Sequence, residues 1–199
     1  WFIKTDEHYT FSFPAFMPPN PNPYKPYGKA LVLAMSLKIT YADGTEETIE
    51  GDDSFKVKAD STVMSNVYGS ETEDGRLRQD GWCLPGFDAS DWEQASVVKK
   101  EDEPKGRLME QFQPAVKVIR TYEGKELSPA GNRKIYDFGQ NMSGMMEFEV
   151  KGKAGDKVLV YPAEKLGEDG DVDQVAKGWV TVDSCITYIV GQSDEWEKF

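Results

Sequence analysis

The sequence of 199 residues predicts an all-β protein made of two β-sandwich modules of the jelly-roll type. Short runs of alternating apolar and polar residues are common, and helical periodicity is hard to find. Gly, Asp and Asn turns separate these runs, which is typical of antiparallel sandwiches. The charged stretch 99–106 marks a boundary, so we place the first module at residues 1–112 and a second, partial one at residues 113–199.

The first 28 residues differ in composition from the rest of the chain, because they hold 6 of its 11 prolines. Proline lacks the N–H that a β-ladder needs and favours extended geometry, so this segment predicts a long ordered loop. We expect aromatic side chains to anchor it on the first sandwich; a proline-rich motif for a partner's SH3-like groove is the alternative. The aromatic residues are Phe11, Phe13, Phe16, Tyr24 and Tyr27.

The clearest strand signal lies at residues 31–41, where Leu37, Ile39 and Tyr41 fall on one face. Asp43-Gly44 follows as a two-residue hairpin signal, and residues 47–49 resume a strand. The remaining strand candidates are Phe55–Val57, Val97–Lys99, Ala115–Arg120, Met145–Val150, Lys157–Tyr161 and Cys185–Val190. Residues 194–199 resemble a strand being entered, and the chain opens on Trp1 without a Met, so we expect a chain truncated at both ends.

The chain carries 23 basic and 35 acidic side chains, so its formal charge is 23 − 35 = −12. This balance argues against nucleic acid and against an anionic membrane surface as partners, and it leaves neutral ligands and bound cations open. The longest purely apolar run, residues 30–35, is far too short to span a bilayer. We expect no membrane partner.

The chain has two cysteines, Cys83 and Cys185, which are far apart in sequence and form no CxxC motif. Two buried free thiols are the favoured interpretation, and a disulfide between them stays open. A classical zinc site and a Ser-His-Asp triad are poorly supported by the sequence, because both need histidine and His8 is the one histidine.

Residues 135–150 place two strand-like runs around a polar centre bounded by Gly139 and Gly144. A phosphate loop is rejected, since two methionines follow Gly144 where Lys and Ser or Thr are required. Two interpretations remain. The favoured one is a structural corner in which Gln140 and Asn141 satisfy backbone groups; the other is a surface that contacts a further part of the protein.

The densest group of carboxylates is Glu71, Glu73 and Asp74, with Arg76 beside it. Residues i and i+2 of a strand come close to the spacing of the two carboxyls of an inverting glycosidase, but any solvated strand meets that spacing. We therefore assign no catalytic residue. Calcium is the candidate cofactor, held by Glu71, Asp74 and a nearby amide or carbonyl. The favoured interpretation is an acidic turn in which Asp74 pairs with Arg76 or caps backbone donors.

Two tryptophans are candidates for stacking on a sugar, because the C–H groups of a sugar face lie well against an aromatic ring. Residues 88–92 form a turn in which Asp and Ser side chains satisfy local amides and direct Trp92 into the core. A core position is also favoured for Trp82, with a sugar platform as the alternative. Residues 167–173 lack the spacing of an EF-hand and predict a hairpin tip with solvated charges.

Taken together, several segments resemble the N-terminal region of bacterial α-L-rhamnosidases, and the resemblance covers nearly the whole chain in order. The segments are Tyr27-Gly28, Leu37–Gly44, Asp53–Lys56, Tyr68–Arg76, Gly81-Trp82, Pro85–Trp92, Tyr136–Gly144, Ala154–Asp156 and Tyr161–Leu166. One departure is Gly75, because the family's usual Asp-Ala-Arg is Asp74-Gly75-Arg76 here.

The resemblance implies a multidomain glycoside hydrolase that removes terminal α-L-rhamnose with inversion, its acid and base lying in an α/α barrel after residue 199. The segment present would be the accessory sandwiches, the second of them concanavalin-like, and inactive alone. A rhamnose-containing carbohydrate and the barrel of the same polypeptide are the implied partners, and a periplasmic or extracellular location is slightly favoured over a cytoplasmic one.

Some members of the family have a calcium-dependent rhamnose-binding module among these sandwiches. The candidate carbohydrate-binding residues on this interpretation are Glu71, Asp74, Arg76 and Trp82. A free-standing carbohydrate-binding module and a structural module of another glycosidase remain the alternative functions.

Overall fold

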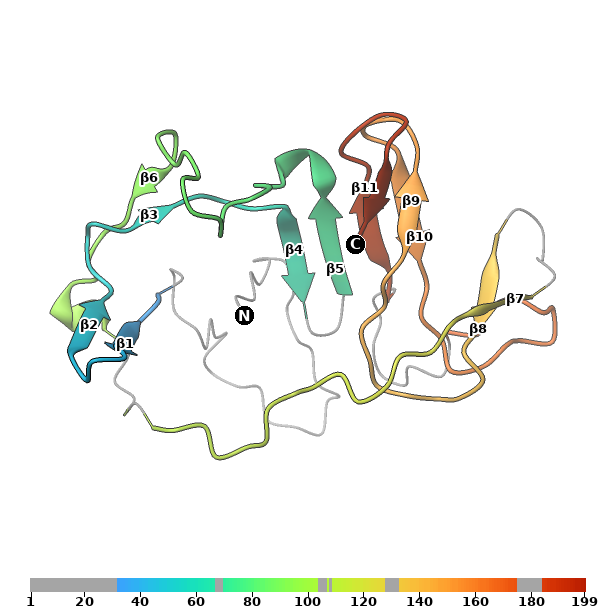
Figure 1. Ribbon diagram of the computed structural model, residues 1–199. Coiled ribbons are helices and arrows are strands. Elements are labelled where there is room, and N and C mark those ends of the chain that lie inside the picture. The colour runs from blue at the N-terminus through green and yellow to red at the C-terminus, as the bar shows by residue number, and fades with distance from the viewer. Residues whose placement is uncertain (1–31, 67–69, 104–106, 108, 128–132, 175–183) are drawn as a thin grey trace. The chain divides into compact units, whose positions relative to one another are not determined.

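The computed structural model describes residues 32–66, 70–103, 107, 109–127, 133–174 and 184–199 (Figure 1). These residues form twelve short strands and two single-turn 3₁₀ helices, η1 (Gly75–Leu77) and η2 (Lys100–Asp102), with no α-helix among them. The predicted all-β class is confirmed. Nowhere in these ranges is there a helix long and apolar enough to cross a membrane.

The chain divides into two compact units, each of which is described here by itself. Unit 1 comprises residues 1–60 and 79–106, and unit 2 comprises residues 61–78 and 107–199. Residues 61–78, which precede the boundary predicted at residues 112 and 113, thus belong to the same unit as residues that follow it. The division at residues 112 and 113 stays a prediction.

Unit 1 contains two two-stranded antiparallel sheets. In the first, β1 (Ser36–Thr40) pairs with β2 (Glu46–Glu50). The turn is longer than the predicted two-residue loop: the Tyr41 N–H donates to the Thr45 carbonyl, and Gly44 takes a φ of 85° as in a three-residue loop. The second sheet joins β3 (Lys56–Val57) to β6 (Glu93–Gln94).

Unit 2 is built around a four-stranded sheet in the order β10-β11-β5-β4 (Figure 1). These strands are β4 (Thr62–Asn66), β5 (Ser70–Asp74), β10 (Lys157–Val160) and β11 (Ile186–Ile189). β5 and β11 run parallel although more than a hundred residues separate them, and the other neighbours are antiparallel. Two further pairs complete the unit: β7 (Lys125–Leu127) with β8 (Ile135–Asp137), and β9 (Glu149–Lys151) with β12 (Trp196–Lys198).

The core of unit 2 lies where the β9–β12 pair meets the four-stranded sheet. Tyr188 of β11 is fully buried, and its ring stacks on Phe199 with centroids 4.0 Å apart. Phe148 packs edge-on against Phe199 at 4.2 Å. Val190 is also fully buried, so alternate residues of β11 and its continuation line this core.

Two predicted strands are wrong. Val97–Lys99 and Ala115–Arg120 form no strand, and the side chains of Val116 and Ile119 are 93% and 96% exposed. Alternation permits extended backbone, but a strand also needs a neighbour that takes up its N–H and C=O groups. These two segments have no strand partner within the described ranges.

Both cysteines are free, and the expectation of burial is wrong for Cys83, which is exposed. Cys185 is half-buried. The proline-rich segment and its aromatic residues lie outside the described residues, so the predicted loop stays a prediction.

Candidate functional site

The carboxylate of Asp74 at the end of β5 is bound by the guanidinium of Arg76. Asp74 is 7% exposed; its Oδ1 accepts from Arg76 Nε at 2.8 Å and its Oδ2 from Arg76 Nη2 at 2.6 Å. Oδ1 also accepts from the Arg76 backbone N–H at 3.1 Å, which caps η1. The hydrogen bonds from Arg76 hold the pKa of Asp74 below its usual range. Asp74 is therefore a charged anchor whose two oxygens are both engaged.

Gly75 lets this turn approach the end of β11 very closely. A Cβ at Gly75 would lie 2.4 Å from Tyr188 Oη and 2.9 Å from the Gly191 backbone nitrogen. A Cβ at Gly191 would in turn lie 2.6 Å from the Gly75 carbonyl carbon. The departure from Asp-Ala-Arg thus has a steric reason here, since alanine at position 75 would collide with this backbone.

A second arginine, Arg78, connects β5 to the C-terminal strand. Its Nε donates to Glu73 Oε1 at 2.8 Å, and its Nη2 donates to the Lys198 carbonyl at 2.8 Å. The guanidinium also lies over the ring of Tyr188, 5.3 Å from the centroid. Arg78 therefore holds three separate segments of unit 2 together.

Glu197 of β12 accepts hydrogen bonds from β11 and the turn that follows it. Tyr188 Oη and the Gly191 N–H donate to its Oε2, each at 2.9 Å, and the Gln192 N–H donates to its Oε1 at 2.6 Å. Burial opposes ionisation, but these hydrogen bonds outweigh it and lower the pKa of Glu197. Burial, aided by the bond to Glu197, raises the pKa of Tyr188 to about 12.

These side chains form one network, which we call the β5–β11–β12 cluster: Glu73, Asp74, Arg76, Arg78, Tyr188 and Glu197. Its carboxylates bind arginines, backbone amides or a phenol, so the arrangement stabilises the join between strands. Arg78, Tyr188 and Glu197 were not predicted from the sequence, because no local motif signals that β5 pairs with β11, which lies more than a hundred residues away.

Glu71, the other predicted calcium ligand, has an exposed side chain that accepts from Ser65 Oγ at 3.3 Å. It shares a strand face with Glu73, whereas Asp74 lies on the opposite face and binds Arg76. No group of three or more His, Cys, Asp or Glu residues in the described ranges could hold a metal ion. Calcium at Glu71 and Asp74 stays a prediction without geometric support.

The two tryptophans have different surroundings. Trp82 is 60% exposed, so the core position favoured for it is wrong and the exposed-platform alternative remains. Trp92 is half-buried and packs edge-on against Phe87 at 5.6 Å. The Ser90 N–H donates to Asp88 Oδ1 at 2.9 Å, as expected for the turn that directs Trp92 inward.

Residues 138–148 connect β8 to β9, which belong to two different two-stranded sheets, and the structural corner stays a prediction. Gly139 has a φ of 74°, and its N–H donates to Asp137 Oδ1 at 2.7 Å. Asp137 thus has the role that was expected of Gln140 and Asn141, whose exposed side chains make no hydrogen bond to the described part of the chain. Gly144 has no neighbouring atom within 4 Å of a Cβ position, so space does not require glycine there.

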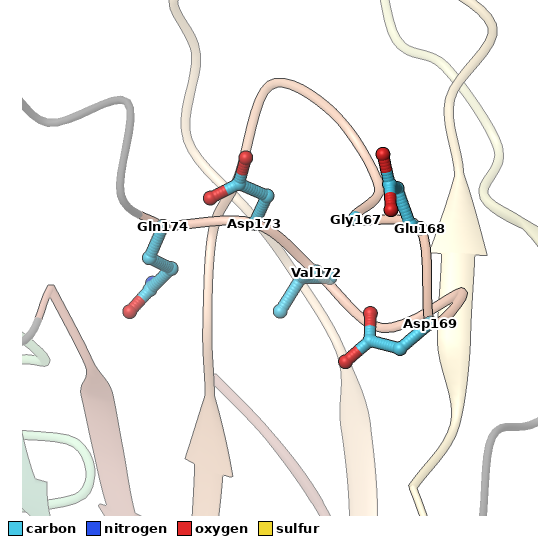
Figure 2. A pocket seen from close by; sticks show the side chains of 6 residues that line it. All are labelled: Gly167, Glu168, Asp169, Val172, Asp173 and Gln174. Atoms are coloured by element: carbon cyan, nitrogen blue, oxygen red, sulfur yellow. The ribbon is translucent and has the colours of Figure 1, made fainter.

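Residues 167–174 border an open hollow of about 410 Å³ (Figure 2). The carboxylates of Glu168, Asp169 and Asp173 stand apart around the loop in Figure 2 and do not converge on one point. Asp173 pairs with Lys165 at 3.0 Å, and the Gly167 N–H donates to the Asp171 carbonyl at 2.8 Å. The geometry is that of the predicted hairpin tip, but only Glu168 and Asp169 are exposed, whereas Asp171 and Asp173 are half-buried and paired with Arg133 and Lys165.

Comparison with known families gives two matches along the chain. Residues 14–120 match the α-L-rhamnosidase N-terminal domain, and residues 128–198 match the bacterial α-L-rhamnosidase concanavalin-like domain. Among curated relatives, an α-L-rhamnosidase of Streptomyces avermitilis is 29% identical over 147 residues, and one of Formosa agariphila is 32% identical over 145 residues. These alignments cover 73% and 72% of this chain but only 14% and 15% of the relatives.

Solved structures give the same result. The α-L-rhamnosidase from Dictyoglumus thermophilum superposes with a TM-score of 0.71 at 28% identity, over 83% of this chain and 18% of that one. The Streptomyces avermitilis α-L-rhamnosidase complexed with L-rhamnose also has a TM-score of 0.71, at 27% identity, over 82% of this chain and 16% of that one. The chain therefore belongs to the α-L-rhamnosidase family of glycoside hydrolases and corresponds to the N-terminal and concanavalin-like domains of its members.

Proposed function

We propose that this chain is a non-catalytic β-sandwich part of a glycoside hydrolase that releases terminal α-L-rhamnose from rhamnose-containing carbohydrates. Its role is to support a catalytic α/α barrel of the same polypeptide and to contribute to substrate recognition. The observation that carries this proposal is the pair of domain matches, at residues 14–120 and 128–198.

The chemistry of the β5–β11–β12 cluster supports a non-catalytic role. An inverting glycosidase needs one carboxylic acid that donates a proton and one carboxylate that activates water. The ion pair with Arg76 holds the pKa of Asp74 low, so Asp74 is a poor proton donor. Glu73 accepts from Arg78 Nε and from Ser61 Oγ, both at its Oε1, so these contacts hold it within unit 2.

The test is hydrolysis of an aryl α-L-rhamnoside by this purified chain, with a polypeptide extended through the catalytic part as the positive control. We expect aglycone release at the buffer rate from the chain and rapid release from the extended polypeptide. Turnover by this chain alone would contradict the non-catalytic role. If the extended polypeptide cleaved another glycoside and not the rhamnoside, this would contradict the proposal that the substrate carries terminal α-L-rhamnose.

The second candidate function is carbohydrate binding by this chain, and the exposed ring of Trp82 favours it. A ligand that binds only the folded state raises its melting temperature, so L-rhamnose at millimolar concentration should raise the Tm of the chain. Trp82→Ala should abolish this shift, whereas Trp196→Ala, which removes another exposed indole, should leave it intact. No shift with L-rhamnose would contradict L-rhamnose binding by this chain.

The same titration in EDTA tests calcium at Glu71 and Asp74. A shift that disappears in EDTA and returns with added calcium would support the metal site, and Glu71→Gln should then weaken it. A shift that survives EDTA would remove calcium from the proposal.

A further inference from the structure

The β1–β2 hairpin has one polar and one apolar face. Leu37 pairs with Ile49 across the ladder, and Ile39 and Tyr41 follow on the same face. Leu37 is 49% exposed, Tyr41 47% and Ile49 37%. The other face carries Lys38 paired with Glu46 at 2.8 Å. The apolar face is therefore the side whose burial against another segment would stabilise the hairpin.

A two-stranded ribbon gains little stability from its ladder alone and needs further strands or a packed face. Within the described ranges β1 and β2 form a sheet of two strands, with no third strand beside them. The register of five residue pairs is nevertheless regular along the whole hairpin. A hairpin whose apolar face is this exposed lacks much of the packing that would stabilise it.

We propose that the apolar face of the β1–β2 hairpin is the docking surface for the aromatic and proline-rich segment of residues 9–31 of the same chain. This segment directly precedes β1, and it contains the aromatic residues Phe11, Phe13, Phe16, Tyr24 and Tyr27. Aromatic side chains bury large apolar areas, so a few of them cover a face of this size.

The prolines of the segment determine how it docks. A strand added to the edge of the hairpin would have to donate N–H groups along its length, and a proline has none. Six prolines lie between residues 14 and 26, so edge pairing is excluded over this stretch. The segment therefore packs through side chains on the face of the hairpin and not through a ladder.

Charge also favours this occupant. The hairpin, residues 36–50, carries one lysine and four acidic residues, so its formal charge is 1 − 4 = −3. Residues 9–31 carry Lys25 and Lys29 and no acidic residue, so their formal charge is +2. Glu47, which lies on the apolar face and accepts from Tyr41 Oη, has no cationic partner among the described residues. The lysines of the segment supply the opposite charge.

The length of the connection allows this contact. Eight residues separate Tyr27 from Ser36, and an extended chain of that length spans at most about 30 Å. A strand of five residues is only about 17 Å long, so the segment can fold back along the entire hairpin.

The test compares thiol labelling on the two faces in the full chain, with Cys83 and Cys185 both replaced by serine. Leu37→Cys places a thiol on the apolar face, and Thr48→Cys places the matched control on the polar face. We expect labelling of the Leu37→Cys protein to be at least about tenfold slower, because the reagent must wait for local opening. Replacing the five aromatic residues with serine should bring the two rates within about twofold of each other.

Equal rates in the full chain would overturn the proposal. A slow rate at Leu37→Cys that persists after the aromatic replacements would also overturn it, because another segment would then cover the face. Protection that grows with protein concentration would identify a second copy as the occupant and contradict it as well. If Leu37→Cys prevents folding, Ile49→Cys probes the same face.

Discussion

The β1–β2 hairpin and the four-stranded sheet of unit 2 are both regular β-ladders, yet their side chains have very different environments. In the hairpin Leu37 and Tyr41 remain about half exposed, whereas Tyr188 of β11 is fully buried. The difference lies in what packs on the ladder. β11 has the aromatic residues of the β9–β12 pair against one face, and the hairpin has no such layer among the described residues.

Charged side chains show the same contrast. Lys38 and Glu46 pair on the hairpin with side chains that are 60% and 52% exposed, whereas Arg78 and Glu73 pair in unit 2 with side chains 28% and 20% exposed. Exposed pairs contribute little because water and salt screen them. The comparison indicates that the hydrogen-bond ladder sets the register of the paired strands. Stability depends more on a second layer of side chains packed against the ladder.

The largest effect is expected for Tyr188→Ala. This change removes a fully buried ring and its hydrogen bond to Glu197, and it should lower the free energy of unfolding by about 3–5 kcal/mol. Thr48→Ala on the polar face of the hairpin is the control and should cost about 1 kcal/mol or less. Urea unfolding measures both. Equal losses would mean that the two regions do not differ in packing.

Gly75→Ala should have an intermediate effect. The new methyl group would meet Tyr188 Oη and the backbone of Gly191, so overpacking should cost about 1–3 kcal/mol. The control is Gly144→Ala, where a Cβ meets nothing within 4 Å and the expected change is about 0.5 kcal/mol at most. Thermal unfolding compares the two variants. A neutral Gly75→Ala would show that η1 and the end of β11 can separate.

The smallest effect concerns pH and Asp74. Because its folded-state pKa is lowered, Asp74 contributes stability that is complete above its ordinary pKa of about 4 and is lost as pH falls through the folded value. Since the Arg76 side chain is half exposed, solvent screening leaves this contribution at about 1 kcal/mol.

Asp74→Asn should therefore be less stable than the parent chain at pH 7, and the gap should narrow below pH 4. Glu46→Gln on the hairpin is the control and should change stability by less than about 0.5 kcal/mol at either pH. A gap for Asp74→Asn that is independent of pH would contradict the assigned role of its charge. Urea unfolding at pH 7 and at pH 3 gives both values.

The sequence by itself determined the all-β class, the hairpin around Gly44, the turn at Asp88 and the family. These features depend on residues close together in the chain, through alternation, turn preferences and motif order, so they can be read locally. Only the tertiary structure decided that β5 pairs with β11, that Arg78 binds the Lys198 carbonyl, and that Trp82 is exposed. Strand pairing and side-chain burial depend on which distant segments pack against each other. The free energy of that packing cannot be read from any one segment. Tyr188 and Glu197 therefore became recognisable as partners only when β11 and β12 lay together.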